Sequence, residues 1–210
     1  MIKIHLAILT KGWIRIEMLK WLVDILFQKK YEIQIQNYYR EPVQSNRNKI
    51  VKDFLETNYD YLVMLDADIV PSKNFLDLIK FDKDIISGLC CGWRFNTLIP
   101  FALLDTKKGI KASSEQGLIK VDKVGTGALI IKKKVLEEIK RPFDVEYDKD
   151  GIVIKGEDFS FCEKAKRAGY EIWVHTDYIC NHYREINLEA IYSFLQEKSS
   201  ENKGRTEEKK

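Results

Sequence analysis

The stretch Tyr61–Val70, YLVMLDADIV, decides the fold of this chain. Its apolar run from Tyr61 to Leu65 is typical of a strand that is covered on both faces. The run ends in Asp66 and Asp68, and two carboxylates so close together repel each other unless something positive lies beside them. A strand-end turn capped by an aspartate is the alternative, but one acid would suffice for that. The pair therefore indicates a bound cation.

The elements around this stretch alternate between strand and helix. Strand patterns occupy Ile2–Ile8, Ile33–Asn37 and Asp84–Leu89, and apolar residues at helical spacing mark Trp13–Phe27, Ile50–Leu55 and Phe75–Ile79. Ser45 or Asn46 is expected to cap the second helix and Ser72 the third. This β-α-β-α-β-α-β order predicts an α/β fold with a Rossmann-like, mostly parallel central sheet and helices on both of its faces.

The second half of the chain follows another pattern. Glycines and short apolar runs from 88 to 124 predict loops and antiparallel pieces, which would form a smaller portion beside the sheet. Further patterns predict strands at 128–131 and 170–174, and helices at 135–139, 188–195 and from Gly156 to a left-handed cap at Gly169. The tail 199–210 lacks apolar residues, which predicts disorder.

Composition excludes several classes of protein. The chain has 210 residues with a net charge of only +3, which gives no case for nucleic acid binding. No apolar run reaches the length of a transmembrane segment, and the apolar start predicts a first strand, not a signal peptide. The four cysteines lack zinc-ligand spacing and include the adjacent Cys90 and Cys91. They predict reduced thiols and a cytoplasmic location.

The position of the two aspartates suggests their ligand. Asp66 and Asp68 follow the third strand, and ligands of open α/β sheets bind in the crevice outside the carboxyl ends of the strands. Hard oxygen ligands favour Mg²⁺ or Mn²⁺. Because Mg²⁺ usually takes only one or two protein carboxylates and completes its shell with waters and phosphates, the substrate is expected to be a phosphate or diphosphate compound.

Three segments in order resemble the GT-A fold of nucleotide-sugar glycosyltransferases, and most closely its family 2. They are Ser45–Pro71, with Arg-Asn before the Asp-x-Asp strand; Lys123–Ile139, with a Gly-rich strand and helix; and Gly156–Tyr183, with a Glu-Asp helix and a late histidine. The resemblance covers nearly all of residues 1–183. It implies a single domain at 1–198, with a nucleotide-binding half at 1–89 and an acceptor-side half at 90–198.

The resemblance also implies a role for individual residues. Asp68 would bind the metal directly, Asp66 would bind the ribose or the waters of the metal, and His182 would join the metal shell, with His175 as a weaker candidate. Asp158 would be the general base, which gives inversion, and Glu157 would hold the acceptor. The helix N-terminus is expected to lower the pKa of Asp158. Contacts with the donor nucleotide and sugar would come from Thr10, Asn37, Tyr38, Arg47, Asn48, Asp66, Ala67, Asp68 and Gly127.

The activity implied is that of a hexosyltransferase that depends on Mn²⁺ or Mg²⁺. Its partners would be a UDP- or GDP-sugar and a glycan, lipid-linked or other hydroxyl acceptor. The chain departs from the family after Thr10, where it reads Leu-Thr-Lys-Gly-Trp. Taken without the resemblance, Glu157 and Asp158 are only favourable charges at a helix start, and Arg47 is a solvated helix charge.

Other functions remain compatible with parts of the sequence. An inactive sugar-nucleotide-binding module would keep every binding residue, and a retaining glycosyltransferase would use the same fold. A phosphohydrolase of the haloacid-dehalogenase type also carries Asp-x-Asp after a strand. In that class the motif follows the first strand of the core, whereas here it follows the third, with Ile69 next and no matching lysine motif.

Overall fold

The computed structural model describes residues 1–39, 42–94, 97–100, 102–105, 108–109, 116–185, 187–189 and 191–196. The expected disordered tail at 199–210 lies outside the described residues. The helices are α1 (Ile16–Phe27), α2 (Val43–Leu55), the 3₁₀ helix η1 (Phe75–Phe81), α3 (Lys133–Glu138) and α4 (Glu157–Arg167). A last helical segment spans 188–189 and 191–196, where the sequence predicted one.

The main sheet has the strand order β2-β1-β3-β11-β5-β14-β4. Its strands are β1 (Lys3–Leu9), β2 (Glu32–Tyr38), β3 (Tyr61–Asp66), β4 (Ile69–Val70), β5 (Ile85–Arg94), β11 (Ala128–Lys132) and β14 (Ile172–His182). The strand β1 is parallel to β2 and β3, and β14 is parallel to β5, while β11 runs antiparallel between β3 and β5. The predicted mostly parallel α/β sheet is therefore confirmed, with one antiparallel strand inserted at its centre.

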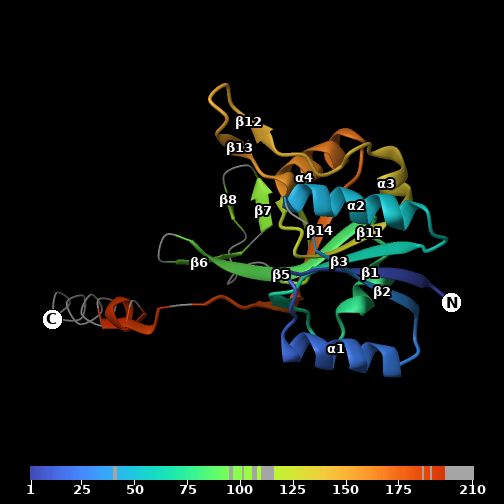
Figure 1. Cartoon of the computed structure of the whole chain (residues 1–210), viewed down its shortest axis with the longest axis horizontal. Coiled ribbons are helices and arrows are strands. Elements are labelled where there is room, and N and C mark those ends of the chain that lie inside the picture. The colour runs from blue at the N-terminus through green and yellow to red at the C-terminus, as the bar shows by residue number, and fades with distance from the viewer. Residues whose placement is uncertain are drawn as a thin grey trace.

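Shorter antiparallel strands complete the fold; the sequence predicted such pieces between 88 and 124, but not the pair between 146 and 155. They are β6 (Thr97–Pro100), β7 (Ala102–Asp105), β8 (Lys108–Gly109), β9 (Leu118–Val121), β10 (Lys123–Val124), β12 (Glu146–Tyr147) and β13 (Val153–Lys155). The strand β6 pairs antiparallel with β5, β9 pairs antiparallel with β14, and β12 and β13 form a separate hairpin. Figure 1 shows this hairpin projecting from the body directly before α4.

Helices cover both faces of the sheet, with α2, α3 and α4 on one face and α1 on the other (Figure 1). Alternation along β3 explains the two layers of core. Leu62 and Met64 pack in the cluster beneath α2 to α4, whereas Val63 and Leu65 pack in the cluster with α1 and η1. The prediction that β3 is covered on both faces is confirmed, and Asp66 continues the alternation toward the α2 side.

Two predicted helix starts are wrong. The helix α2 begins at Val43 with Pro42 at its N-cap, so neither Ser45 nor Asn46 caps it. The side-chain amide of Asn46 instead donates to the carbonyl of Tyr38 at 3.3 Å, inside the fold. Arg47 and Asn48 therefore lie in the second turn and do not open the helix. Ser72 does not cap η1 either, because Asn74 is at the N-cap and the amide of Phe75 donates to the backbone carbonyl of Ser72 and not to its hydroxyl.

Candidate active site

The two aspartates of the motif leave the sheet in different directions. The strand β3 ends at Asp66, and Ala67 and Asp68 form a turn before β4. The amide of Asp66 donates to the carbonyl of Gly127 at 2.9 Å, and the amide of Ala67 donates to the carbonyl of Leu9 at 2.9 Å. These bonds fix the turn between β1 and β11, and each carboxylate meets its own cationic partner.

Asp66 faces Arg47 of α2. The Nη2 atom of Arg47 lies 3.1 Å and 3.3 Å from the two carboxylate oxygens of Asp66. The same guanidinium reaches the carboxylate of Glu157 from Nε at 3.4 Å and the carbonyl of Thr126 from Nη1 at 3.3 Å. Its side chain is only 5% exposed, so Arg47 is not a solvated helix charge. It is a buried link between the Asp-x-Asp turn and the start of α4.

Asp68 faces the end of β14. Its Oδ2 atom lies 3.4 Å from Nε2 of His182 and 3.4 Å from Nη1 of Arg184. The backbone explains this proximity, because β4 pairs with β14 through Ile69 and His182, and the amide of Tyr183 donates to the carbonyl of Asp68 at 2.9 Å. The strand β14 continues to His182, well past the end at residue 174 that the sequence predicted.

The imidazole of His182 is oriented by its second nitrogen. Nδ1 lies 3.0 Å from the carbonyl of Cys91, and since a carbonyl only accepts, Nδ1 carries a proton there. Nε2 therefore faces Asp68: it donates to the carboxylate when the ring is protonated and offers its lone pair to a cation when the ring is neutral. Burial raises the pKa of Asp68, but the hydrogen bond and charge of His182 and the charge of Arg184 outweigh it, and the net shift is downward.

The side chains of Asp68 and His182 lie where a hard cation could bind. Within the described ranges, no group of three or more His, Cys, Asp or Glu side chains gathers as a metal site. A carboxylate and an imidazole nitrogen 3.4 Å apart nevertheless fit an ion that takes its remaining ligands from water and phosphate oxygens. Asp68 and His182 would hold such an ion, while both oxygens of Asp66 are engaged by Arg47.

A cavity of about 690 Å³ opens at this edge of the sheet. That volume falls within the range of roughly 300–1,000 Å³ that is usual for small-molecule sites. Its lining comprises Leu9, Thr10, Lys11, Trp13, Arg15, Val43, Asn46, Asp66, Ala67, Asp68, Tyr183, Arg184 and Glu185. Thr10, Asp66, Ala67 and Asp68 were predicted donor contacts.

The sequence did not predict that the arginines Arg15 and Arg184 line this cavity. The guanidinium of Arg15 lies 4.0 Å from the ring centroid of Tyr183, and Arg184 contacts Asp68. The two residues come from opposite ends of the chain. Arg15 follows Thr10 and Arg184 follows His182 within a few residues. This closeness in sequence to predicted site residues could have indicated that both arginines belong to the site.

Thr10 and Asn48 are occupied by contacts within the protein. The hydroxyl of Thr10 accepts from the amides of Gly12 and Trp13 at 3.0 Å each and donates to the carbonyl of Trp13. It therefore shapes the loop, with Gly12 at φ +103°. The amide of Asn48 bonds both backbone groups of Phe143, at 2.6 Å and 3.2 Å, which fastens α2 to the segment after α3.

Asn37 and Tyr38 are not part of the cavity lining. Tyr38 is buried, with its hydroxyl 3.3 Å from Nε2 of His5, while Asn37 is exposed on the opposite side of β2. His5 lies among Tyr38, Phe54 and Tyr59, as expected of a packing residue. The weaker metal candidate, His175, is surrounded by the rings of Phe81 and Tyr178.

Gly127 permits the close approach of β11 to the Asp-x-Asp turn. A Cβ at this position would lie 2.9 Å from Oδ2 of Asp66 and 2.4 Å from Cδ1 of Ile69. No side chain fits there unless Asp66 moves. The sequence predicts that a glycine here lets the backbone approach the donor sugar or the acceptor closely, and the geometry adds that Gly127 leaves room for Asp66.

We expect Gly127→Ala to displace Asp66 and so to reduce kcat/KM for the sugar transfer that the sequence predicts by roughly ten- to a hundredfold. Displacements of about 1 Å in a catalytic site have effects of that size. The measurement is steady-state turnover beside a thermal unfolding curve. A variant that unfolds at the wild-type temperature and turns over normally would show that Asp66 needs no such space.

The other candidate pair, Glu157 and Asp158, opens α4. Glu157 is held by Arg47, and Oδ1 of Asp158 accepts the amide of Phe159 at 2.7 Å. Burial, together with the negative charge of Glu157, raises the pKa of Asp158 above its ordinary value. The expectation that the helix N-terminus would lower this pKa is wrong, since desolvation outweighs the helix dipole here. A raised pKa makes Asp158 a stronger base.

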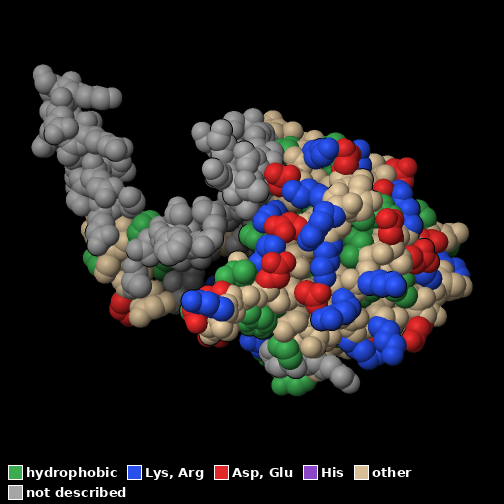
Figure 2. All heavy atoms as spheres, turned by 90° about the horizontal axis from the view of Figure 1, so that it is seen from above, with side chains coloured by type: hydrophobic (Ala, Val, Ile, Leu, Met, Phe, Trp, Pro, Cys, Tyr) green, Lys and Arg blue, Asp and Glu red, His purple; other side chains and the backbone are tan. Residues whose placement is uncertain are grey.

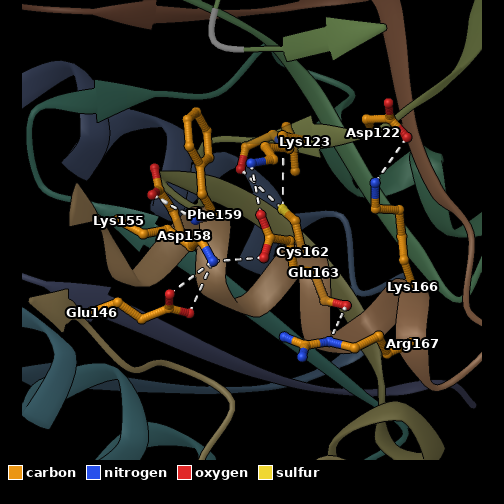
Figure 3. A network of polar contacts seen from close by, with 11 residues as sticks. Asp122, Lys123, Glu146, Lys155, Asp158, Phe159, Cys162, Glu163, Lys166 and Arg167 are labelled. Carbon is orange, nitrogen blue, oxygen red and sulfur yellow. Dashed lines mark hydrogen bonds and ion pairs between the residues drawn. The ribbon is translucent and has the colours of Figure 1, made fainter. Parts of the chain in front are cut away.

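A network of charges anchors the hairpin and β10 to α4 (Figure 3). Nζ of Lys155 lies 2.9 Å from both carboxylate oxygens of Glu146 and 2.7 Å from Glu163, and Nζ of Lys123 lies 2.9 Å from Glu163. The hydrogen bonds from Lys155 and Lys123 lower the pKa of Glu163 to about 2. Glu163 stands in the second turn of α4, so this network holds the helix that presents Asp158.

Glu163→Gln is expected to lower stability at neutral pH by roughly 1 kcal/mol, as for a networked surface ion pair. Because the folded-state pKa of Glu163 is depressed, its stabilisation is full above the unfolded-state pKa near 4.5 and declines as pH falls toward about 2. Thermal melts of both proteins between pH 7 and pH 2 should therefore converge. Glu171→Gln, which removes a single exposed pair with Lys120, is the matched control with a smaller effect. A difference that stays constant with pH would contradict this account.

Comparisons with known proteins bear on the fold. No protein-family model and no curated protein matches the chain. Solved structures do. A197 from STIV aligns with a TM-score of 0.62 over 88% of this chain and 87% of A197, at 24% identity. GalNAc-T7 with UDP, GalNAc and Mn²⁺ aligns with a TM-score of 0.50 over 87% of this chain, at 14% identity.

The fold is GT-A-like. This chain spans 44% of GalNAc-T7, so the likeness concerns less than half of that protein. At these identities the comparisons show an architecture shared with glycosyltransferases, and they assign no reaction to this chain.

Proposed function

We propose that this chain is a metal-dependent glycosyltransferase that moves a sugar from a nucleoside-diphosphate sugar to an acceptor hydroxyl. The observation that carries the proposal is the pairing of Asp68 with Nε2 of His182, 3.4 Å apart, at the edge of a cavity that Asp68, Arg15 and Arg184 line. Carboxylate, imidazole and guanidinium groups together suit a diphosphate with its cation.

Different residues at the cavity would bind different parts of the donor. A bound Mn²⁺ or Mg²⁺ would act as a Lewis acid that neutralises the leaving diphosphate. Asp68 and His182 would hold that ion, and Arg15 and Arg184 would contact the phosphates. Asp66, fixed by Arg47 and 30% exposed, would bind the ribose or a metal-bound water.

The two acids at the start of α4 would position and deprotonate the acceptor. Asp158 would remove the proton of the acceptor hydroxyl as that oxygen bonds to the anomeric carbon. The bond from that carbon to the diphosphate breaks at the same time, and the diphosphate leaves with the electron pair. Attack opposite to the leaving group gives inversion. Glu157, held by Arg47 at 3.4 Å, would position the acceptor.

A thermal-shift screen tests the proposal. UDP-, GDP-, CMP- and dTDP-sugars are each measured with and without Mn²⁺, since a ligand that binds only the native state raises its melting temperature. The structure of GalNAc-T7 contains UDP and Mn²⁺, which makes that pair the first to try. We expect a UDP- or GDP-sugar to raise the melting temperature only when Mn²⁺ is present. No shift with any nucleotide, or equal shifts without metal, would contradict the proposal.

A further inference from the structure

The helix α1 is apolar on two faces, and only one of them is buried. Met18, Trp21, Leu22 and Ile25 pack against the sheet. The opposite face exposes large apolar side chains at helical spacing, with exposures between 42% and 80%. We call these the α1 stripe; its members are Ile16, Leu19, Val23, Leu26 and Phe27. Trp13, also more than half exposed, precedes the helix.

The stripe occupies an outer surface of the molecule. Figure 1 places α1 on the side of the sheet opposite α2, α3 and α4. The face above those three helices, seen in Figure 2, carries closely mixed basic and acidic side chains with small hydrophobic patches between them. Neighbouring apolar side chains on one exposed helix face are instead typical of an interaction surface.

The charges beside the stripe are mostly positive. Residues 11–30 expose the lysines Lys11, Lys20, Lys29 and Lys30 against the aspartate Asp24. The other acid of this segment, Glu17, has a side chain that is 43% exposed and pairs with Arg15 at 3.6 Å. Lys30 pairs with Asp77. Lys20 lies within the stripe by spacing, four residues after Ile16. A helix with Trp, Phe or Leu side chains on an apolar face and lysines on its polar side is characteristic of a membrane interface.

We propose that α1 and the preceding loop dock this protein onto an anionic lipid bilayer, with the α1 stripe in the interface and the lysines at the headgroups. The helix has 12 residues, which is too short to cross a hydrocarbon core that needs about 20. Within the described residues, no helix has the length and hydrophobicity of a membrane span. The contact proposed lies in the plane of the bilayer.

Charge favours a bilayer over a second copy of this chain. A two-fold contact through the α1 stripe would bring the lysines of both copies together, and juxtaposed like charges oppose association. An anionic surface attracts the same lysines, each contributing to binding near the headgroups.

Docking would also orient the cavity. Trp13 and Lys11 line the cavity and adjoin α1, so the cavity opens beside the proposed contact surface. An acceptor carried by the membrane would then reach the site directly. This last step rests on the proposed function, whereas lipid binding does not.

Vesicle flotation tests the docking. The full chain is mixed with vesicles of phosphatidylcholine alone or with phosphatidylglycerol added. We expect flotation with the anionic vesicles, weakened by salt, and little with the neutral ones. Leu19→Glu with Val23→Glu should weaken binding by about tenfold or more, because two apolar contacts become repelled charges. Both side chains are exposed, so the melting temperature should stay near that of the wild type.

A matched variant tests whether lipid binding depends on the α1 stripe or on exposed apolar side chains in general. Ile152→Glu with Ile154→Glu changes two side chains of the β12–β13 hairpin that are each 64% exposed, with the same added charge. It should float as the wild type does. The proposal is overturned if the wild type does not float with anionic vesicles, or if the hairpin variant loses as much binding. It is also overturned if light scattering shows a dimer that the α1 variant dissociates.

Discussion

Replacing Asp68 by asparagine is expected to abolish the metal-dependent part of donor binding. The change keeps the size of the side chain but removes the charge that faces His182 and Arg184 at 3.4 Å each. Removing a hydrogen-bonded neighbour of a metal ligand already lowers metal affinity by about ten- to a hundredfold, so the loss of a ligand should exceed about a hundredfold. Calorimetric titration of UDP or GDP with and without Mn²⁺ measures this.

The control for Asp68→Asn is Glu185→Gln. Glu185 lines the same cavity and the substitution changes the charge equally, but Glu185 is not placed against His182. This variant should bind within about threefold of the wild type, since an exposed charge contributes little through solvent. If Asp68→Asn keeps its metal-dependent affinity, the assignment of Asp68 as a ligand is wrong.

Asp158→Asn is expected to reduce kcat by roughly a thousandfold, because a positioned general base contributes about a hundred- to ten-thousandfold. Donor affinity should stay near the wild-type value, since Asp158 is not among the residues that line the donor cavity. Steady-state kinetics with a productive donor and acceptor, beside a donor titration, measure both quantities. Normal kcat in a variant that binds donor normally would refute the base assignment.

The pKa shift of Asp158 adds a test on stability. Burial raises this pKa, so the ionised carboxylate is less favourable in the folded chain than in the unfolded one. The cost is present at neutral pH and disappears as pH falls through the raised pKa. Asp158→Asn removes it, and the variant should melt at or above the wild-type temperature at pH 7. A purely structural aspartate would lose stability when replaced.

Glu157→Gln distinguishes the role of Glu157 from that of Asp158, the two acids in the first turn of α4. Glu157 is bound to Arg47 and carries no proposed proton transfer. Its replacement should raise the KM for the acceptor with a smaller effect on kcat, which is the opposite of the pattern for Asp158→Asn. Equal losses of kcat in both variants would mean that the pair acts as one unit.

The strand and helix order was readable because hydrophobic periodicity is a local signal. Tyr61–Leu65 alternates between the two core layers as predicted, and α4 ends at a left-handed Gly169 with φ +87°. Periodicity also located α1, but the residues at helical spacing that mark it, Ile16, Leu19, Val23 and Leu26, face solvent. The buried face, around Trp21 and Ile25, is equally apolar, so spacing within the helix did not indicate which side packs.

Which side chains meet in the site was harder to predict, because this depends on contacts between segments that lie far apart in the sequence. Arg47 was read as the start of a helix, yet α2 begins earlier at Val43 and places the guanidinium in the interior. Arg184 and Arg15 reach one cavity from opposite ends of the chain. The direction of the Asp158 pKa shift depended on burial, which the helix position alone did not reveal.

The most direct test of the proposed reaction is turnover of nucleotide sugars by the wild-type chain. Release of nucleoside diphosphate is followed from UDP- and GDP-sugars, with Mn²⁺ and with the metal removed by a chelator. We predict release that requires Mn²⁺ and is lost in both Asp68→Asn and Asp158→Asn. A wild-type chain that binds a nucleotide sugar with Mn²⁺ but releases no diphosphate, with any acceptor class offered, would contradict the transferase and leave a binding module.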